Sequence, residues 1–175
     1  MSHVDPVVDQ LLAIKQIAWL VRDTGGQAAV LLSQGFNAGR LPALPIFVDS
    51  PLATNVTEIF RTHLDDLDPE LRASLSSDRD PFGFARLTYT RSVEESKALN
   101  DSKDPCVVIA ASGMCEAGRI LHHLDHGLGD KRNTVLIVGF QAEHTLGRRL
   151  VEKKPFVKVF GREKEKREPI RFLKD

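Results

Sequence analysis

Two unbroken apolar runs, Val107-Val-Ile-Ala110 and Val135-Leu-Ile-Val138, decide the fold class of this 175-residue chain. Neither run alternates between apolar and polar residues, so each predicts a strand that is covered on both faces, as in a parallel sheet. Strands are expected at 28–32, 45–49, 87–90, 106–111, 134–140 and 156–160, and helices at 53–63, 92–100, 118–126 and 145–152. This alternation predicts an α/β fold: an open, mostly parallel sheet of about five or six strands with helices on both faces.

The beginning of the chain predicts a further helix. Apolar residues from Val7 to Val21 recur every three or four positions, Asp5 and Pro6 suit a helix start, and Gly25-Gly26 suits its end. The segment 33–44 is short and rich in glycine and proline, which leaves little room for the helical crossover that parallel neighbours generally need. The polar, acidic stretch 65–84 is expected to be an irregular excursion.

Composition excludes several functional classes. The chain is 42% hydrophobic, enough for one domain with a real core, and carries 24 basic and 24 acidic residues, which excludes a globally basic nucleic-acid binder but leaves room for a local patch. No apolar run is long enough for a membrane span and no leader is visible, so a cytoplasmic protein without membrane contact is expected. Cys106 and Cys115 fit no paired zinc or redox motif and are expected to be free thiols.

Three loops that follow predicted strands have compositions suited to an anion, and in open α/β sheets the ligand crevice lies beyond the carboxyl ends of the strands. Ser50 begins a predicted helix, where its hydroxyl either contacts a ligand or simply caps the helix. The loop 110–119 has small residues that allow close approach, with Arg119 supplying charge. The loop 138–149 carries Arg148 and Arg149, whose alternative interpretation is an ordinary surface helix face.

Four sequence words carry a family resemblance, in order, over residues 41–162. They are Pro-Ile-Phe-Val-Asp-Ser-Pro-Leu-Ala (45–53), Tyr-Thr-Arg-Ser-Val-Glu-Glu-Ser-Lys-Ala-Leu-Asn (89–100), Ile-Ala-Ala-Ser-Gly-Met-Cys-Glu-Ala-Gly-Arg-Ile-Leu-His-His-Leu (109–124) and Arg-Asn-Thr-Val-Leu-Ile-Val-Gly-Phe-Gln-Ala-Glu-His-Thr-Leu-Gly-Arg-Arg-Leu (132–150). Together they resemble the β-CASP domain, a Rossmann-like α/β domain of metallo-β-lactamase-fold RNA-processing nucleases. The whole chain, 1–175, is interpreted as one such domain without the metallo-β-lactamase domain.

The resemblance implies a cap that binds RNA rather than cuts it. In the family, RNA passes between the cap and a lactamase half whose two zinc ions activate the attacking water. The family's zinc-binding word, His-x-His-x-Asp-His, is missing from this sequence, so the chain is expected to hold no catalytic residue, metal or cofactor and to be inactive alone. A separate metallo-β-lactamase domain is a possible partner. The residues implied to contact RNA are Ser50, Ser112, Gly113, Met114, Arg119, Gln141, Thr145, Arg148 and Arg149.

Other interpretations stay open. His122 and His126 share a predicted helix face, but no spacing supplies the third ligand that a zinc site needs. The chain could instead be a homodimeric interaction module without nucleic-acid activity, with its first helix exchanged between copies. A small-molecule α/β enzyme ranks last because no nucleophile–base pair is recognisable. Finally, His144 stands where the family usually has glycine, which raises the question of a backbone with positive φ at that position.

Overall fold

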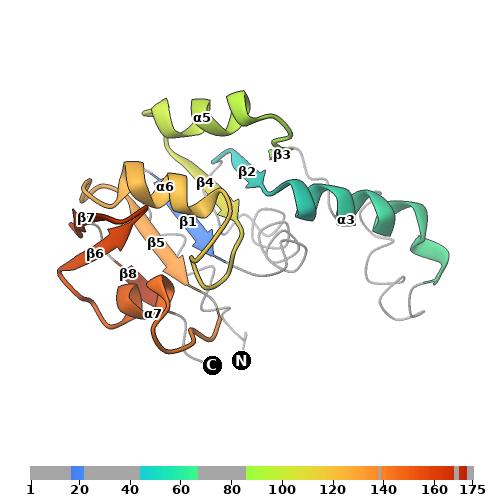
Figure 1. Ribbon diagram of the computed structural model, residues 1–175. Helices are drawn as coiled ribbons and strands as arrows, with labels where there is room; N and C mark the ends of the chain where they lie inside the picture. Colours follow the sequence, from blue (N-terminus) through green and yellow to red (C-terminus); the bar gives the residue numbers. More distant parts are fainter. Residues whose placement is uncertain (1–16, 22–43, 67–85, 138, 168–169, 173–175) are drawn as a thin grey trace, which may run out of the picture.

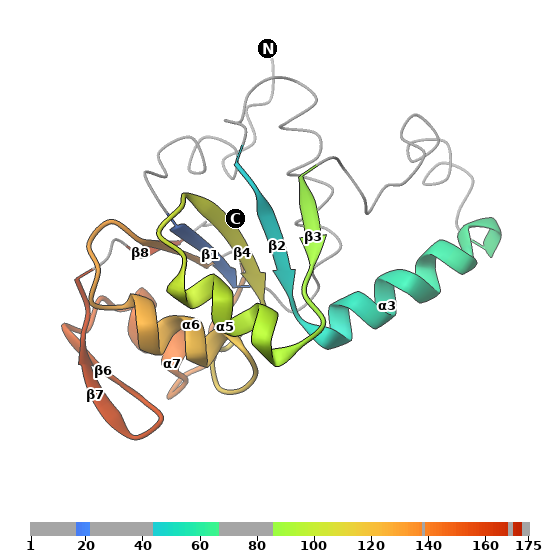
Figure 2. The same cartoon turned by 90° about the horizontal axis from the view of Figure 1, so that it is seen from above.

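The computed structural model describes residues 17–21, 44–66, 86–137, 139–167 and 170–172, and its main feature is a parallel sheet. The strands lie in the order β3 (Leu87–Tyr89), β2 (Ile46–Asp49), β4 (Cys106–Ala110), β1 (Ile17–Val21), β5 (Thr134–Ile137) and β8 (Ile170–Phe172). Every neighbouring pair in this six-stranded sheet is parallel. Figure 2 shows β3, β2, β4 and β1 side by side. The predicted α/β fold with an open parallel sheet is therefore confirmed.

Both faces of β4 and β5 are buried, as their unbroken apolar runs predicted. All residues of β4 and β5 are buried. On one face, Val108 of β4 and Ile137 of β5 belong to a core cluster that includes Leu124 and Leu150 from the helices. On the other face, Ile109 of β4, Val48 of β2 and Leu136 of β5 are also buried. A strand with cover on both sides has no polar face to produce an alternating pattern.

The helices occupy the positions that the sequence indicates. They are α3 (Pro51–Thr62), a short 3-10 turn at Leu64–Asp66, α5 (Val93–Asp101), α6 (Ile120–Gly127) and α7 (Leu146–Val151). Ser92 and Glu95 form the capping box that starts α5. Helices α5, α6 and α7 lie on one face of the sheet, whereas α3 extends away from the end of β2 (Figures 1 and 2). Helices on the second face stay a prediction, since the described helices that pack on the sheet share one face.

One prediction was wrong within the described residues. Ile17–Val21, expected to end the first helix, is the strand β1, which lies between β4 and β5 and pairs with both. Its five consecutive residues, Ile-Ala-Trp-Leu-Val, form a short apolar run, and spacing cannot distinguish such a run from a buried helix segment. The start of that predicted helix, the strand at 28–32, the segment 33–44 and most of 65–84 lie outside the described residues.

The predicted strand at 156–160 forms, but outside the main sheet. β6 (Phe156–Val159) pairs antiparallel with β7 (Arg162–Glu165) in a two-stranded ribbon. The two strands are joined at Phe160 and Gly161, with φ of 49° and 73°. Positive φ at both central residues is what a tight hairpin turn requires. The buried side chains of Val157 and Val159 attach the ribbon to the core on the helical face.

A search of the described helices finds none long and apolar enough to cross a bilayer.

Candidate nucleic-acid interface

The three predicted loops meet at one edge of the sheet. Strands β2, β4 and β5 run parallel, so the segments that follow them leave from the same carboxyl edge. Ser50 follows β2, Ser112 lies in the loop after β4, and Thr145 ends the loop after β5. The loop before α5, which follows β3, joins them at this edge. The candidate site is therefore assembled from segments far apart in the sequence.

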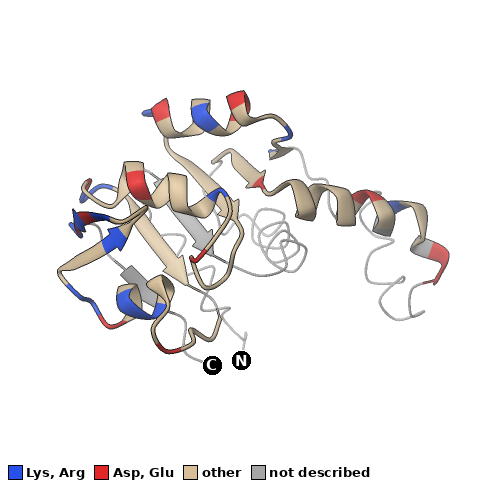
Figure 3. Ribbon diagram, in the orientation of Figure 1, with Lys and Arg blue, Asp and Glu red and all other residues tan. Residues whose placement is uncertain are grey.

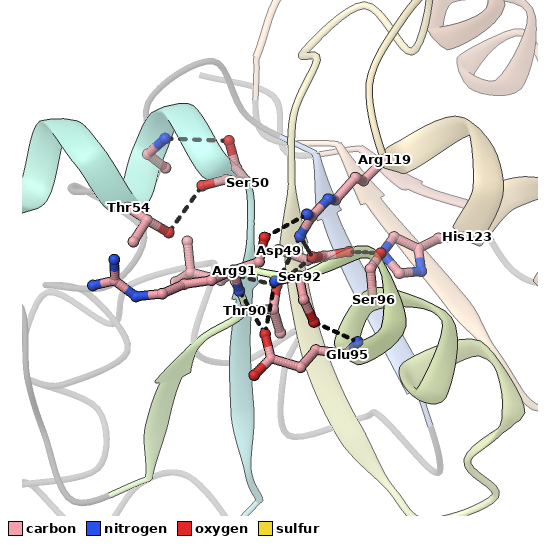
Figure 4. Close-up of polar contacts among 12 residues, drawn as sticks. Asp49, Ser50, Thr54, Thr90, Arg91, Ser92, Glu95, Ser96, Arg119 and His123 are labelled. Carbon is pink, nitrogen blue, oxygen red and sulfur yellow. Dashed lines mark hydrogen bonds and ion pairs between the residues drawn. The ribbon is translucent and has the colours of Figure 1, made fainter.

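On the β2 side of this edge, Asp49 is the centre of a buried polar network that we call the Asp49 cluster. Its Oδ1 accepts hydrogen bonds from the Thr90 hydroxyl and from Nη1 of Arg119 at 2.5 Å (Figure 4). Its Oδ2 accepts from the Ser96 hydroxyl at 2.6 Å and lies 2.7 Å from Nε2 of His123. Because a carboxylate only accepts, Nε2 of His123 carries a proton.

The Asp49 cluster keeps a charge inside the protein. Burial alone would raise the pKa of Asp49, but hydrogen bonds from His123, Ser96, Thr90 and Arg119 outweigh burial and hold that pKa well below its usual range. The carboxylate is therefore ionised at neutral pH although its side chain is fully buried. All four surrounding groups donate to it, so the charge is compensated within the fold and needs no ligand.

Arg119 is engaged by the protein itself. Besides its ion pair with Asp49, its Nη1 contacts the Thr90 hydroxyl at 3.2 Å, and its Nη2 donates to the carbonyl oxygen of Arg91 at 2.9 Å. Its side chain is only 15% exposed. A guanidinium with five fixed donors can bridge several segments in this way. Arg119, expected to contact RNA, thus joins the loop after β4 to the loops after β2 and β3.

On the β5 side of the edge, the loops after β4 and β5 are joined by a set of amide and carbonyl contacts that we call the Gln141 clamp. Beside this clamp, the exposed carboxylate of Glu116 accepts a hydrogen bond from the amide of Leu146. Nε2 of Gln141 donates to the carbonyl oxygens of Gly113 at 2.8 Å and Phe140 at 2.9 Å. The amide of Gly147 donates to the carbonyl oxygen of Met114 at 3.0 Å. Gln141, Gly113 and Met114 therefore shape the edge through their backbone and amide contacts.

Two positions in these loops, 147 and 144, are suited to glycine, the first for lack of space and the second for its backbone conformation. A Cβ added to Gly147 would lie 1.7 Å from Oε1 of Gln141, so no larger residue fits without displacing the clamp. At the position where the family usually has glycine, His144 has a φ of 67°. The loop therefore keeps the left-handed conformation with a residue that tolerates it less well than glycine does.

Two predicted hydroxyl contacts are occupied by helix capping. The Ser50 hydroxyl accepts from the amide of Ala53 at 3.3 Å at the start of α3. The Thr145 hydroxyl accepts from the amide of Arg148 at 3.2 Å and donates to the carbonyl oxygen of Ala142 at 2.7 Å. The capping interpretation of Ser50, left open by the sequence, describes its contact in this structure.

The groups that face outward belong to the loop after β4 and to α7. Arg149 is exposed and its side chain has no hydrogen-bond or ion-pair partner within the part of the chain that the structure describes. Arg148 forms an ion pair with Glu152 across one helical turn at 2.8 Å, with both side chains 40% exposed. Within the same described ranges, the Ser112 hydroxyl makes no hydrogen bond. Lys and Arg positions, coloured blue on the ribbon, lie on α7 and on the β6–β7 ribbon in Figure 3.

The residues described here do not fit a zinc centre. His123 is held in the Asp49 cluster, and Nδ1 of His126 contacts the carbonyl oxygen of His122. The His122 ring lies against that of Phe160 in a tilted arrangement, with ring centroids 4.8 Å apart. Among the described residues, no group of three histidine, cysteine, aspartate or glutamate side chains is arranged to hold a metal ion.

The two cysteines are free thiols, as the sequence predicted, and both are buried. Burial, with a smaller contribution from Asp104, raises the pKa of Cys106 to about 11. Burial, with a smaller contribution from Glu116, raises the pKa of Cys115 to about 12. Neither side chain therefore forms the thiolate that a nucleophile or a metal ligand needs at neutral pH.

Sequence reasoning missed the Asp49 cluster, although its members lie in the family-like words. Asp49 directly precedes Ser50, Thr90 and Ser96 belong to the word 89–100, and His123 belongs to the word 109–124. A buried strand that ends in a carboxylate was the available signal, because a buried charge must find partners.

The fold and the strand-end loops define an α/β domain with a polar carboxyl edge, and comparison with known proteins gives its family. A family model described as the Beta-Casp domain matches residues 28–150. The chain therefore belongs to this family, and its resemblance to the β-CASP domain of metallo-β-lactamase-fold RNA-processing nucleases is confirmed.

Individual relatives agree with this assignment. The chain is 41% identical over 124 residues to a ribonuclease of Thermus thermophilus, an alignment that covers 71% of this chain and 29% of that protein. It is 33% identical over 122 residues to transcription termination factor FttA of Methanocaldococcus jannaschii, an alignment that covers 69% of this chain and 19% of that protein. An RNase J-like protein of the same organism is 30% identical over 123 residues, an alignment that covers 70% of this chain and 27% of that protein. The chain thus spans less than a third of the length of each of these relatives.

Proposed function

We propose that this domain binds the backbone of single-stranded RNA along the carboxyl edge of its sheet, as the RNA-gripping cap of a zinc-dependent RNA-processing nuclease. The observation that carries the proposal is the convergence of the loops after β2, β4 and β5 on one edge in a chain of the Beta-Casp family. Relatives named as a ribonuclease and as an RNase J-like protein support RNA as the ligand.

The outward groups on the β5 side suit RNA phosphates best. Arg149 has an exposed guanidinium, Arg148 is in an exposed ion pair that a phosphate could replace at little cost, and Ser112 offers a hydroxyl. Arg119 contributes indirectly, because it holds the loops in place from the Asp49 cluster. The family resemblance implies nine RNA contacts. Of these, we propose that Ser112, Arg148 and Arg149 contact the RNA directly.

In this proposal, a metallo-β-lactamase domain cuts the RNA and this chain does not. The family's zinc-binding word is missing from the sequence, and the described residues form no zinc site. Zinc, held by a metallo-β-lactamase domain, would supply the activated water, and this domain would hold the RNA against it. We therefore expect the chain alone, incubated with labelled RNA and zinc chloride, to leave the RNA intact.

Salt-dependent binding tests the proposal directly. The 175-residue chain is titrated into fluorescently labelled decauridylate, and anisotropy is followed between 50 and 200 mM KCl. With about two phosphates neutralised, by Arg148 and Arg149, the affinity should fall roughly 7-fold over this range, because counterions are released on binding. Binding that is absent at 50 mM KCl contradicts the proposal.

A matched pair of variants locates the binding. Arg149→Ala should weaken binding and make the logarithmic salt slope shallower by about 0.7, the contribution of one phosphate on a single strand. Lys131→Ala removes the same charge from the turn that precedes β5, at the amino edge of the sheet, and should leave binding unchanged. An equal loss in both variants would mean that binding is a general charge effect.

A homodimeric interaction module is a second candidate, favoured by one observation. Leu52, Val56 and Ile59 are exposed on α3 and lie on one face of that helix, because they are spaced by four and three residues. An exposed apolar helix face of this kind often marks a protein contact. Sedimentation equilibrium of the wild type and of Ile59→Glu distinguishes the candidates: a dimer that the substitution dissociates supports the module, and a monomer at high concentration removes it.

A further inference from the structure

An aromatic ring stands exposed at the proposed RNA-binding edge. Phe140 follows β5 and is 74% exposed, the highest value among the large apolar side chains that the structure describes. Removing a phenylalanine ring from water is favourable, and the flat face of an exposed ring at a binding edge is available to a flat ligand. The family resemblance did not single out this residue.

The backbone beneath this ring is firmly held. The buried side chain of Gln141 donates to the carbonyl oxygen of Phe140 itself and, across to the neighbouring loop, to that of Gly113. The same Nε2 of Gln141 donates to the carbonyl oxygen of Gly139, which precedes Phe140, at 3.3 Å, and the amide of Ala142 contacts the sulfur of Met114 at 3.3 Å. Phe140 is thus fixed between anchored residues, so ordering its backbone for a ligand costs little entropy.

We propose that Phe140 is a stacking platform for an unpaired nucleobase of the bound RNA. The inference rests on the proposed function and deepens it, because it adds base contact to backbone contact. Stacking of a base on an aromatic side chain is tolerant of sequence, since every base has a π face. Phosphate contacts from Ser112, Arg148 and Arg149 would set the path of the strand, and Phe140 would hold one base beside it.

The surroundings of Phe140 favour a base over a protein partner. Among the residues that the structure describes, the other exposed large apolar side chains lie on α3, at the start of α5 and on the β6–β7 ribbon, so none of these shares the loop of Phe140. Leu52 and Val93 follow β2 and β3, which are three and four strands away from β5 and thus about 14 and 19 Å along the edge. A lone ring is too small for a stable protein interface but is the right size for one base.

Base-dependent binding tests this inference with the full chain. Wild type, Phe140→Ala and Phe140→Trp are titrated with deca-adenylate, decauridylate and an abasic ribose-phosphate decamer in 50 mM KCl. We expect wild type to bind deca-adenylate best and the abasic strand worst. Phe140→Ala should bind deca-adenylate about 5- to 100-fold more weakly, the loss of one stacked base, and bind the abasic strand as wild type does.

The tryptophan variant reports on stacking itself. Phe140→Trp should keep the affinity of wild type, and its added indole fluorescence should be quenched by deca-adenylate but not by the abasic strand. The matched control is Phe156→Ala, which removes another exposed ring, 54% exposed, from the β6–β7 ribbon and should leave RNA binding unchanged. Unchanged melting temperatures show that the variants are folded.

Each remaining result overturns the inference in a recognisable way. Wild type that binds all three strands equally, with Arg149→Ala still weaker, leaves the proposed backbone binding intact and removes the stacking platform. Wild type that binds none of them removes the proposed function and this inference together. A Phe140→Ala variant with normal RNA affinity but altered sedimentation identifies the ring as a protein contact instead.

Discussion

The two halves of the carboxyl edge are held together by opposite means. The Asp49 cluster joins the loops after β2, β3 and β4 through a buried carboxylate with four donors. The Gln141 clamp joins the loops after β4 and β5 through amides and carbonyls, and the carboxylate beside it, Glu116, is exposed rather than buried. In the Asp49 cluster, the charges of Asp49 and Arg119 neutralise each other within the protein. On the side of the Gln141 clamp, Arg149 and the ring of Phe140 are exposed.

This difference teaches which charged residues at a strand-end edge are available to a ligand. Arg119 looks like a phosphate contact in the sequence, yet it neutralises Asp49. Arg149 looks like an ordinary helix-surface residue, yet it is the one with an uncommitted side chain among the described residues of α7. Charge alone therefore does not identify the binding side, because a buried carboxylate is paired with cationic side chains of the same protein, which are then not available to a ligand.

The largest expected effect comes from breaking the Asp49 cluster. Asp49→Asn removes the charge and leaves Arg119 and His123 without their anion, so the free energy of unfolding should fall by about 3–5 kcal/mol. Ser96→Ala removes one donor and keeps the charge, and it should cost about 1.5–3 kcal/mol. Urea denaturation of both variants measures the difference. Equal costs would mean that the charge itself contributes nothing.

Acid should weaken the same cluster. The pKa of Asp49 is lower in the folded protein than its value of about 4 in the unfolded chain, so its stabilisation is fully present above about pH 5 and is lost as pH falls below 4. The gap in unfolding free energy between wild type and Asp49→Asn should therefore shrink from pH 6 to pH 3. Asp130, whose pKa is lowered to about 2 by Arg132, is present in both proteins and cancels from this gap.

A smaller loss is expected when the Gln141 clamp is crowded. Gly147→Ala places a methyl group against Oε1 of Gln141, and the forced shift should cost about 1–3 kcal/mol. Gly129→Ala is the matched control, because a Cβ there meets nothing within 4 Å, and its stability should be close to that of wild type. If RNA binding also requires the clamp, Gly147→Ala weakens it more than the stability change explains.

His144 offers a gain rather than a loss. Its φ of 67° is strained for a residue with a Cβ, so His144→Gly should raise the free energy of unfolding by about 0.5–1 kcal/mol. His144→Ala keeps the Cβ and should give no such gain. Thermal melting of the three proteins compares them, and a glycine variant less stable than the alanine variant would show that the backbone is not strained here.

The smallest effect belongs to the exposed pair on α7. Glu152→Gln breaks its ion pair with Arg148, and since such surface pairs are weak, the melting temperature should stay within experimental error. The freed arginine should raise the affinity for decauridylate about twofold at low salt. A large loss of stability would show that Arg148 is a structural residue like Arg119, and the contrast between the two sides would disappear.

Many helices and strands of this domain could be predicted from the sequence. Helices α3, α5, α6 and α7 and most strands lie where local patterns indicated, since capping residues and apolar periodicity are local signals. β1 was missed because an apolar run of five residues fits a helix face equally well until neighbouring strands pair with it. β6 was recognised as a strand, but its antiparallel partner across Phe160-Gly161 was not.

By itself, the sequence determined the parallel sheet and the family, because unbroken apolar runs and ordered motifs survive without any knowledge of contacts. It also placed Ser50, Ser112 and Thr145 at strand ends. Only the tertiary structure decided what each group does there. Asp49 and Arg119 are 70 residues apart in the chain, and their union in a buried ion pair depends on which strands become neighbours. That choice left Arg149 and Phe140 exposed at the other end of the same edge.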